Sequence, residues 1–455
     1  MKLLFVSLGC DKNLVDSEVM LGLLEQKGYT FTDDETEAEI VVVNTCCFIN
    51  DAKEESINTI LEMAELKKSG QVKALIVAGC LAQRYQKEIR EEIGEVDAIV
   101  GTAAVEEIAE AVEEALAGKT GNHIVPLESK SKSEPVQKPK PAGNHKRLVT
   151  TGGHYAYLKI AEGCDKHCTY CIIPKVRGQY RSVPMEQLTA EAERLAREGV
   201  KELILVAQET TRYGVDLYGE KKLPELLRRL CKIPQLYWIR ILYCYPEEIT
   251  QELIDTIKRL PKVCRYLDIP IQHSSDRILK RMGRRTKREE IAAVLQKLRR
   301  EIPGIALRTT LITGFPGETE EDFADLKDFV REQRFERLGV FLYSQEEDTP
   351  AAEFEAQVDE EIKEARRDEI MALQQEIAFE KCQEQIGREL SVMVEGSLPE
   401  ENLPEGRVYI ARTYMDAPEV DGYVFVKSEW NLMSGDFITV RVVGAEGYDL
   451  IGELI

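Results

Sequence analysis

The first 120 residues alternate short apolar runs with longer amphipathic stretches. The runs that predict buried strands are Leu3–Leu8, Ile40–Asn44, Ala74–Ala78 and Ala98–Val100. Helical periodicity, as in Asp16–Lys27 and Asp51–Lys68, fills the stretches between them. Strands that are apolar on both faces and separated by helices are typical of a parallel sheet covered on both sides. We therefore predict an N-terminal α/β domain with an open parallel sheet over residues 1–120.

Residues 121–150 interrupt this alternation. The segment GNHIVPLESKSKSEPVQKPKPAGNHKRLVT is rich in Pro, Ser and Lys, a composition typical of a linker. Its six Lys and Arg residues are expected to solvate the linker rather than to form a binding patch.

A second alternation of strands and helices occupies residues 151–382. The six predicted strands are Ala156–Ala161, Glu202–Val206, Trp238–Tyr243, Leu267–Ile271, Ala306–Thr313 and Leu338–Tyr343. Helices such as Met185–Gly199 and Lys287–Glu301 lie between them, and a charged helix over about Asp359–Gln385 follows. Six such units predict a partial (β/α)6 barrel whose active face lies at the carboxyl ends of the strands. An open doubly wound sheet is the alternative.

From residue 383 the pattern changes to short β-rich runs separated by Gly, Pro, Asp and Asn. These runs are Leu390–Val394, Gly406–Ala411, Gly422–Val426 and Phe437–Val443. Their spacing predicts a small antiparallel, OB-like β-barrel over residues 383–455. The segment holds 14 Asp and Glu against 5 Lys and Arg, a net charge of -9. Barrels of this kind often bind RNA, but this charge has the wrong sign for phosphate contacts.

Composition narrows the class of protein. The chain of 455 residues has a 43% hydrophobic fraction, enough for several cores, and a net charge of -21. This charge argues against a nucleic-acid partner that is held through its phosphates. The start KLLFVSLG after Met1 is too short for a signal peptide, and no apolar run approaches the ~20 residues that span a bilayer. We therefore expect a cytoplasmic protein without membrane contact, in which thiols stay reduced.

The stretch EGCDKHCTYCIIP places Cys164, Cys168 and Cys171 in a C-x₃-C-x₂-C triplet. Such spacing in a cytosolic chain indicates metal or iron–sulfur ligation rather than disulfides. A 4Fe-4S cluster held by three thiolates keeps one iron open for S-adenosylmethionine. The alternatives are a zinc knuckle and three buried thiols. No fourth ligand follows at zinc spacing, which favours the cluster.

A second set of cysteines shares one structural position. Cys10, Cys46 and Cys80 each follow a predicted parallel strand, at the sheet edge where open α/β folds bind ligands. Gly9 and Gly79 allow sharp turns before two of them. Three convergent thiolates predict a second cluster with a free iron. Cys47 adjoins Cys46, and only one of the two should face the cluster; spacing does not choose between them.

Motifs along nearly the whole chain are similar to those of the methylthiotransferases of the radical S-adenosylmethionine superfamily, within them the ribosomal-protein (RimO-type) branch. The matching motifs are SLGCDKNLVDSE at 7–18, VNTCCFINDAKEES at 43–56, GCLAQRY at 79–85, YLKIAEGCDKHCTYCIIPKVRG at 157–178, AQETTRYGVDLYG at 207–219, DIPIQH at 268–273, RTTLITGFPGETEEDF at 308–323 and GVFLYSQEEDTPA at 339–351. The resemblance implies an N-terminal methylthiotransferase domain, a radical barrel and a C-terminal TRAM barrel. Two positions depart from the family pattern, with Asp11 in place of Pro and Cys47 in place of Gly. The second departure makes the choice of Cys46 depend on the family pattern.

The resemblance also implies a reaction. A methylthio group is inserted at the β-carbon of an aspartate of the twelfth small-subunit ribosomal protein, a basic partner. One S-adenosylmethionine methylates a sulfide on the auxiliary 4Fe-4S cluster of Cys10, Cys46 and Cys80. A second is cleaved at the 4Fe-4S cluster of Cys164, Cys168 and Cys171, and the resulting 5′-deoxyadenosyl radical abstracts hydrogen from the substrate. An electron donor such as flavodoxin or ferredoxin is implied as well.

Three further residues are candidate contacts of S-adenosylmethionine. Tyr170, between two ligand cysteines, is placed to lie against the adenine. Gln208 follows a predicted strand and is a hydrogen-bonding candidate, and Arg308 is a candidate partner for the carboxylate. Each has an alternative role in packing or surface pairing.

Two other functions are weighed against this one. The sister branch (MiaB-type) methylthiolates an adenosine of transfer RNA with the same clusters. Its members typically carry a Gln-Met-Asn type of segment after the first cysteine, where this chain has LGCDKN, and the net charge of -9 on the C-terminal barrel suits a basic protein better than RNA. A non-enzymatic iron–sulfur carrier is less favoured because carriers use fully ligated clusters.

Overall fold

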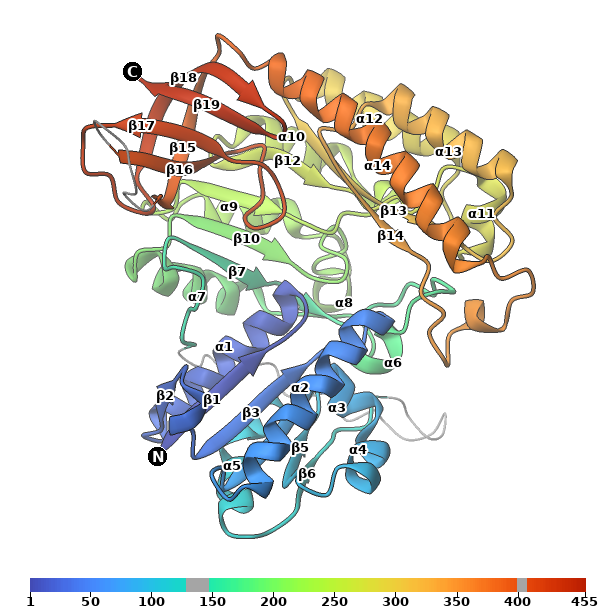
Figure 1. The fold of residues 1–455 in the computed structure, drawn as a ribbon. Coiled ribbons are helices and arrows are strands. Elements are labelled where there is room, and N and C mark those ends of the chain that lie inside the picture. Colours follow the sequence, from blue (N-terminus) through green and yellow to red (C-terminus); the bar gives the residue numbers. More distant parts are fainter. Residues whose placement is uncertain (128–146, 399–406) are drawn as a thin grey trace. The chain divides into compact units, whose positions relative to one another are not determined.

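The computed structural model describes residues 1–127, 147–398 and 407–455. It contains two compact units, each described by itself. The first comprises Met1–Thr150, Lys159–Gln187 and Ser344–Ala352, and the second comprises Thr151–Leu158, Leu188–Tyr343 and Glu353–Ile455. Figure 1 shows both units, with many of their elements labelled.

The first unit is built on a six-stranded sheet of order β2-β1-β3-β4-β5-β6, with every pair of neighbours parallel. Its strands are β1 (Lys2–Ser7), β2 (Thr30–Thr32), β3 (Ile40–Thr45), β4 (Ala74–Gly79), β5 (Ala98–Val100) and β6 (Gly121–His123). Its helices are α1 (Asp11–Gln26), α2 (Asn50–Lys68), α3 (Cys80–Arg84), α4 (Gln86–Glu92), α5 (Ile108–Leu116) and α6 (Ile173–Arg177). The two-stranded sheet of β8 (Ala161–Glu162) and β9 (Arg181–Ser182) also belongs to it.

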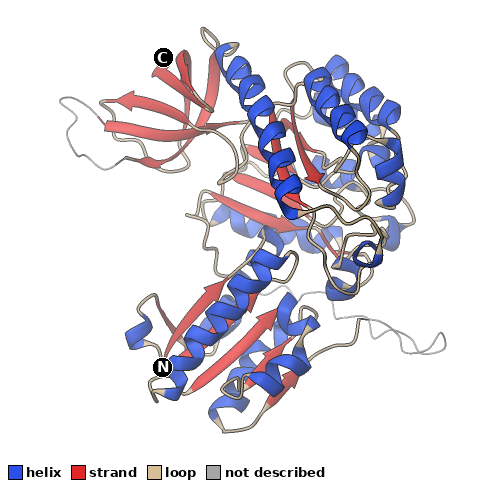
Figure 2. Cartoon of the chain, turned by 45° about the vertical axis from the view of Figure 1, so that its right-hand side comes forward, coloured by secondary structure: helices blue, strands red, loops and turns tan. Residues whose placement is uncertain are grey.

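Both faces of this sheet are covered by helices, as Figure 2 shows. Successive residues of a strand point to opposite faces. In β3, Ile40 and Val42 join the core beneath α1 and α5, whereas Val41 and Val43 join the core beneath α2, α3 and α4. This explains why β3 reads as a continuous apolar run, and it confirms the predicted open parallel α/β domain.

The second unit contains a parallel sheet of order β7-β10-β11-β12-β13-β14, which confirms the predicted set of six strands. The strands are β7 (Tyr155–Lys159), β10 (Glu202–Val206), β11 (Trp238–Ile241), β12 (Val263–Asp268), β13 (Ala306–Thr313) and β14 (Arg337–Leu342). The helices are α7 (Met185–Arg197), α8 (Val215–Tyr218), α9 (Leu223–Leu230), α10 (Gln251–Arg259), α11 (Asp276–Arg281), α12 (Arg288–Glu301), α13 (Glu320–Gln333) and α14 (Glu360–Gln383). Spatial order follows chain order, as in a partial barrel and unlike the doubly wound alternative.

The C-terminal strands close into a barrel of order β15-β16-β17-β19-β18. They are β15 (Glu389–Ser397), β16 (Arg407–Thr413), β17 (Val424–Ser428), β18 (Phe437–Glu446) and β19 (Asp449–Leu454). All pairs are antiparallel except β17 with β19, which is parallel. Within the second unit, this barrel shares an apolar core with Trp238, Cys264 and Tyr266 of the larger sheet.

Several bounds differ from the sequence prediction. The strand β12 covers Val263–Asp268, whereas the predicted strand was Leu267–Ile271. Residues Gly121–His123, assigned to the linker, form β6 and add a strand to the first sheet. The strands β2 and β19 carry weak apolar patterns and were not predicted. Most of the predicted linker, residues 128–146, lies outside the described residues. Among the described residues, no helix is long and apolar enough to cross a membrane.

Candidate functional site

Cys10, Cys46 and Cys80 lie beyond the carboxyl ends of three adjacent strands, β1, β3 and β4. These strands are in register, because Ser7 pairs with Asn44 and Thr45 pairs with Gly79. Cys10 is the N-cap residue of α1 and Cys80 is the first residue of α3. Parallel strands in register bring their following loops to one edge of the sheet. The three cysteines therefore lie along one edge of the sheet, and their role as cluster ligands stays a prediction.

Two glycines let these loops approach each other closely. Gly9 has φ +91°, and a Cβ on it would lie 2.6 Å from Cβ of Cys46 and 3.0 Å from its Sγ. Gly79 has φ +92°, and a Cβ on it would lie 2.3 Å from Oδ1 of Asn44. Only glycine fits such positions, for reasons of both space and backbone conformation. The loop before Cys10 is thus packed directly against Cys46.

Cys46 and Cys47 have different surroundings. The Cys46 side chain packs against Gly9, and its backbone is fixed by Ser56, whose Oγ accepts from the Cys46 N–H at 3.0 Å and donates to its carbonyl at 2.9 Å. Cys47 is fully buried in the apolar core beneath α2 and α3. Burial raises the pKa of the Cys47 thiol to about 12. Burial raises the pKa of the Cys46 and Cys80 thiols as well, so the choice of Cys46 rests on its packing against the glycine that precedes Cys10.

The triplet Cys164, Cys168 and Cys171 occupies the loop between β8 and α6. Gly163, at φ +79°, allows the loop to approach the backbone of Gly178 and Gln179, and the Cys164 N–H donates to the Gly178 carbonyl at 3.0 Å. The Lys166 N–H lies 3.4 Å from Sγ of Cys164. Backbone donors to sulfur are typical of iron–sulfur loops. Backbone hydrogen bonds therefore hold the loop that carries the three cysteines.

Residues 344–352, which follow β14, contact both cysteine regions of the first unit. The Ala351 N–H donates to the Thr169 carbonyl inside the triplet at 2.9 Å. Glu346 pairs with Arg84 of α3 at 3.1 Å and with Lys53 of α2 at 3.5 Å. Glu346 is 1% exposed, so this is a buried ion cluster. The segment ties the triplet loop to the helices that follow Cys46 and Cys80.

The candidate S-adenosylmethionine contacts fall in both units. Tyr170 is half-buried in the triplet loop of the first unit, and Gln208 is half-buried just after β10 in the second. Arg308 is the third residue of β13, so it lies nearer the amino end of that strand. Its Nη1 lies 3.2 Å from Asp268, and its Nε lies 3.6 Å from Asp421. All three roles stay predictions, and Arg308 already has two carboxylate partners.

Sequence reasoning missed the buried polar residues around the cysteines, chiefly Asn13, Asp16, Arg177 and Glu346. Charged residues are mostly exposed in folded proteins, so a sequence alone predicts them at the surface. The available signal was their position within the quoted motifs, since Asn13 and Asp16 lie just after Cys10 and Arg177 lies just after Cys171.

The residues present fit iron–sulfur clusters. Among the described residues, no group of three or more Cys, His, Asp or Glu side chains is arranged to hold a single metal ion. Cluster ligands have a different arrangement, because each thiolate binds a separate iron of the cluster. Two sets of three thiols, each in a glycine-containing loop, match that requirement.

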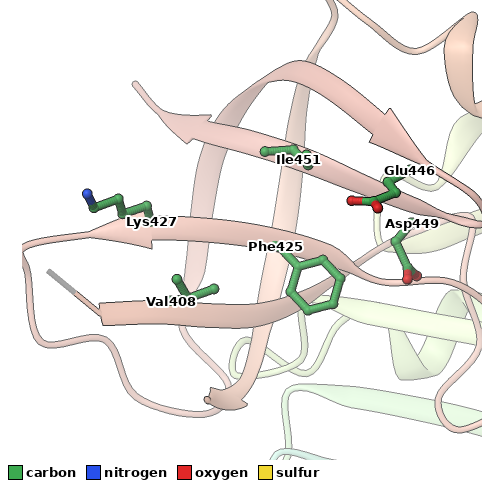
Figure 3. A pocket seen from close by; sticks show the side chains of 6 residues that line it. All are labelled: Val408, Phe425, Lys427, Glu446, Asp449 and Ile451. Atoms are coloured by element: carbon green, nitrogen blue, oxygen red, sulfur yellow. The ribbon is translucent and has the colours of Figure 1, made fainter. Parts of the chain in front are cut away.

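A separate hollow of about 570 Å³ lies on the C-terminal barrel. Figure 3 shows Phe425 near its centre, Glu446 and Asp449 toward one end and Lys427 toward the other; Val408 and Ile451 complete the lining. The surface is thus apolar with two carboxylates and one ammonium group. It contains no cysteine and forms no part of the two cysteine sites.

Three parts of the chain match known families. Residues 2–101 match the model described as uncharacterized protein family UPF0004, residues 158–330 match the radical SAM superfamily, and residues 386–455 match the TRAM domain. The fold is similar to the solved radical S-adenosylmethionine methyltransferase TsrM from Kitasatospora setae, with a TM-score of 0.55, 16% identity, and coverage of 77% of this chain and 73% of that one. The parallel sheet, the triplet and these matches define an enzyme of the radical S-adenosylmethionine class.

Full-length relatives give the family. Proteins named ribosomal protein uS12 methylthiotransferase RimO are 61% identical in Lachnoclostridium phytofermentans, covering 99% of each chain. They are 51% identical in Pelotomaculum thermopropionicum, covering 100% of this chain and 99% of the relative. The chain belongs to the uS12 methylthiotransferase family of radical S-adenosylmethionine enzymes. Membership implies a 4Fe-4S cluster and S-adenosylmethionine.

Proposed function

We propose that this enzyme inserts a methylthio group at the β-carbon of an aspartate of ribosomal protein uS12, using two 4Fe-4S clusters and two molecules of S-adenosylmethionine. The observation that carries the proposal is the presence of two separate cysteine triplets in one compact unit. It is supported by 61% identity over 99% of the chain to a protein named for that activity. One triplet suffices for radical formation, and a second is needed to hold sulfur.

Each set of three cysteines would hold one cluster. Cys164, Cys168 and Cys171 would hold the cluster that cleaves S-adenosylmethionine, and Cys10, Cys46 and Cys80 would hold the auxiliary cluster. When bound, the clusters supply the electron for that cleavage and the site for the transferred sulfur. Gly9 packs against the Cys46 side chain, and Ser56 holds the Cys46 backbone. The contact of Cys46 with Gly9, next to Cys10, supports the choice of Cys46 over Cys47 as the ligand.

Binding of S-adenosylmethionine would involve Tyr170 against the adenine and Gln208 as a hydrogen-bonding residue. Both are half-buried, and Gln208 lies beyond the carboxyl end of a barrel strand, where such folds bind ligands. Arg308 would have to give up its ion pair with Asp268 or Asp421 before it could bind the carboxylate of S-adenosylmethionine. Its position makes it the weakest of the three candidates.

Docking of a basic ribosomal protein is supported by the net charge of -9 on residues 383–455. The hollow around Phe425 offers an apolar surface beside Glu446 and Asp449. The alternative substrate, an adenosine of transfer RNA, would meet this barrel with the wrong charge. A flavodoxin or ferredoxin as electron donor, and a cytoplasmic location, stay predictions.

The two triplets can be tested separately. Two variants of the full chain are compared after reconstitution with iron and sulfide, one with Cys164, Cys168 and Cys171 changed to Ala, the other with Cys10, Cys46 and Cys80 changed to Ala. With dithionite, S-adenosylmethionine and uS12, we expect the first to form no 5′-deoxyadenosine, and the second to form it without adding a methylthio group. Methylthiolated uS12 from either variant would contradict the proposal.

A further inference from the structure

Arg177 is a buried cation between the two cysteine sets. It is the last residue of α6, which begins two positions after Cys171, and it is 2% exposed. Its Nη1 lies 2.5 Å from Oδ2 of Asp16 and 3.0 Å from Oε2 of Glu162. Its Nη2 donates to Oδ1 of Asn13 at 3.0 Å. Burying a guanidinium group costs several kcal/mol of desolvation, and only well-placed partners offset that cost. The three partners of Arg177 therefore hold its side chain in one position.

Asn13, which accepts a hydrogen bond from Arg177, also contacts the loops that carry the auxiliary cysteines. Its Nδ2 donates to the Leu8 carbonyl, two residues before Cys10, and lies 3.4 Å from the Thr45 carbonyl, next to Cys46. Nδ2 of Asn44 donates to the Asn13 carbonyl at 3.0 Å. Because the Asn13 side-chain oxygen is held by Arg177, its amide is oriented toward both loops. Through Asn13, Arg177 thereby helps to hold the backbone at Leu8, before Gly9, and at Thr45, before Cys46.

Apolar packing joins the same elements. Ile172 and Val176, beside and within α6, share a core with Cys80 and Leu81 of α3. The Thr102 hydroxyl donates to the Val176 carbonyl at 2.7 Å. Arg177 therefore cannot move independently of the helix that begins at Cys80.

The charges around Arg177 are balanced before any cluster is bound. Asp16 and Glu162 are shared by Arg177 and by Lys159, which lies 2.8 Å from Glu162. A cluster bound by three thiolates would add negative charge near Arg177.

We propose that Arg177 is a positioning residue of the auxiliary site: from the helix that follows the radical triplet, it holds the loops of Cys10 and Cys46 and compensates the charge of a cluster bound there. This rests on the proposed function, which assigns the auxiliary cluster to those cysteines. Reduction potentials of iron–sulfur clusters depend on nearby charge. Arg177 therefore makes the auxiliary cluster easier to reduce.

The test measures the midpoint potential of the auxiliary cluster alone. The parent is the full chain with Cys164, Cys168 and Cys171 changed to Ala, reconstituted with ferrous iron and sulfide and titrated with EPR detection. We expect Arg177→Gln to lower the reduced-to-oxidised ratio at the parent midpoint about tenfold, which is about 59 mV for one electron. Asp16→Asn, which removes an opposing charge, should shift the potential the other way. Arg177→Lys should stay near the parent.

Lys27→Gln is the matched control, because it removes one positive charge from the same unit at an exposed position. It should leave the potential unchanged. Equal potentials for Arg177→Gln, Asp16→Asn and this control would overturn the proposal, as would shifts of the same sign for the first two. A parent that binds no iron would instead overturn the ligand assignment of the proposed function, and this proposal with it.

Should Arg177→Gln bind no iron, Asp16→Asn and Glu162→Gln decide the matter, because both leave Arg177 in place. A less negative potential in both supports charge compensation by Arg177. An unchanged potential in both overturns it and leaves Arg177 a purely structural residue.

Discussion

At the scale of single residues, Gly9 determines where the Cys46 thiol can lie. A Cβ there would lie 2.6 Å from Cβ of Cys46, whereas Gly28, also at positive φ, has nothing within 4 Å. Gly9→Ala and Gly28→Ala should both cost about 1–2 kcal/mol in backbone strain, but only Gly9→Ala should displace Cys46. We predict that Gly9→Ala lowers the iron content by about half and that Gly28→Ala keeps it. Equal iron in both would contradict the packing argument.

The choice between Cys46 and Cys47 is also a residue-scale prediction. Cys46→Ala should lose the auxiliary cluster because the Cys46 side chain packs against Gly9, next to Cys10, and Cys47→Ala should keep the cluster because only one of two consecutive side chains can point to that side. Iron and sulfide per chain measure the difference. The opposite result would assign the ligand to Cys47.

At the residue scale, sequence analysis can propose ligands where the chemistry leaves a spacing signature, and the six cysteine ligands stay a prediction. The six cysteine positions follow from their places after strands and within the triplet. The separation of Cys46 from Cys47 did not follow, because it depends on the contact with Gly9 across 37 positions of sequence. Arg177 and Asp16 were missed because burial of an ion pair depends on tertiary contacts that no local pattern records.

At the scale of elements, the segment after β14 should stabilise the first unit through Glu346. Glu346→Gln would leave the buried side chain of Arg84 without its carboxylate partner. Breaking a buried pair from one side costs about 3 kcal/mol at the low end of the usual range, which urea denaturation of the chain can measure. Glu113→Gln, at an exposed pair with Lys27, is the control and should cause no measurable change. Equal effects would contradict the role of the segment.

A buried ion triad joins β10 and β11 of the second unit to β16. Glu202 lies 2.7 Å from Arg240 and 2.7 Å from Arg412, and all three are 0% exposed. Burial alone would raise the pKa of Glu202, but the two guanidinium groups hold it below its ordinary value of 4.5.

Protonation of Glu202 is therefore linked to unfolding at acid pH. Because the folded pKa is the lower one, the stabilisation is present above about pH 4.5 and is lost as the pH falls through the folded value. We predict that Glu202→Gln is less stable at pH 7 and loses part of the acid sensitivity of the second unit. Parallel stability curves for the variant and the natural chain between pH 3 and 7 would contradict this.

The elements that were predicted from sequence are those with continuous apolar runs. β10 and β13 match their predicted bounds, and β5 does as well. The strands β2 and β6 have three residues each and a polar composition, and they form by pairing with β1 and β5. The parallel pairing of β17 with β19 was likewise invisible, because strand direction within a barrel depends on its closure.

At the scale of the whole molecule, the described chain divides into two compact units, and the three-domain division made from the sequence stays a prediction. The radical triplet belongs to the first unit together with the auxiliary cysteines, and the C-terminal barrel belongs to the second. Residues 159–187 and 344–352 join the first unit through contacts such as Arg177 with Asp16 and Glu346 with Arg84. Both sets of three cysteines therefore lie in one compact unit, although they are far apart in the sequence.

The most direct measurement is the mass of the product. The reconstituted natural chain is incubated with dithionite and S-adenosylmethionine, in parallel with uS12 and with transfer RNA, and each substrate is examined by mass spectrometry. We predict one added methylthio group on an aspartate of uS12 and none on the RNA. A methylthiolated adenosine together with unmodified uS12 would contradict the proposed substrate.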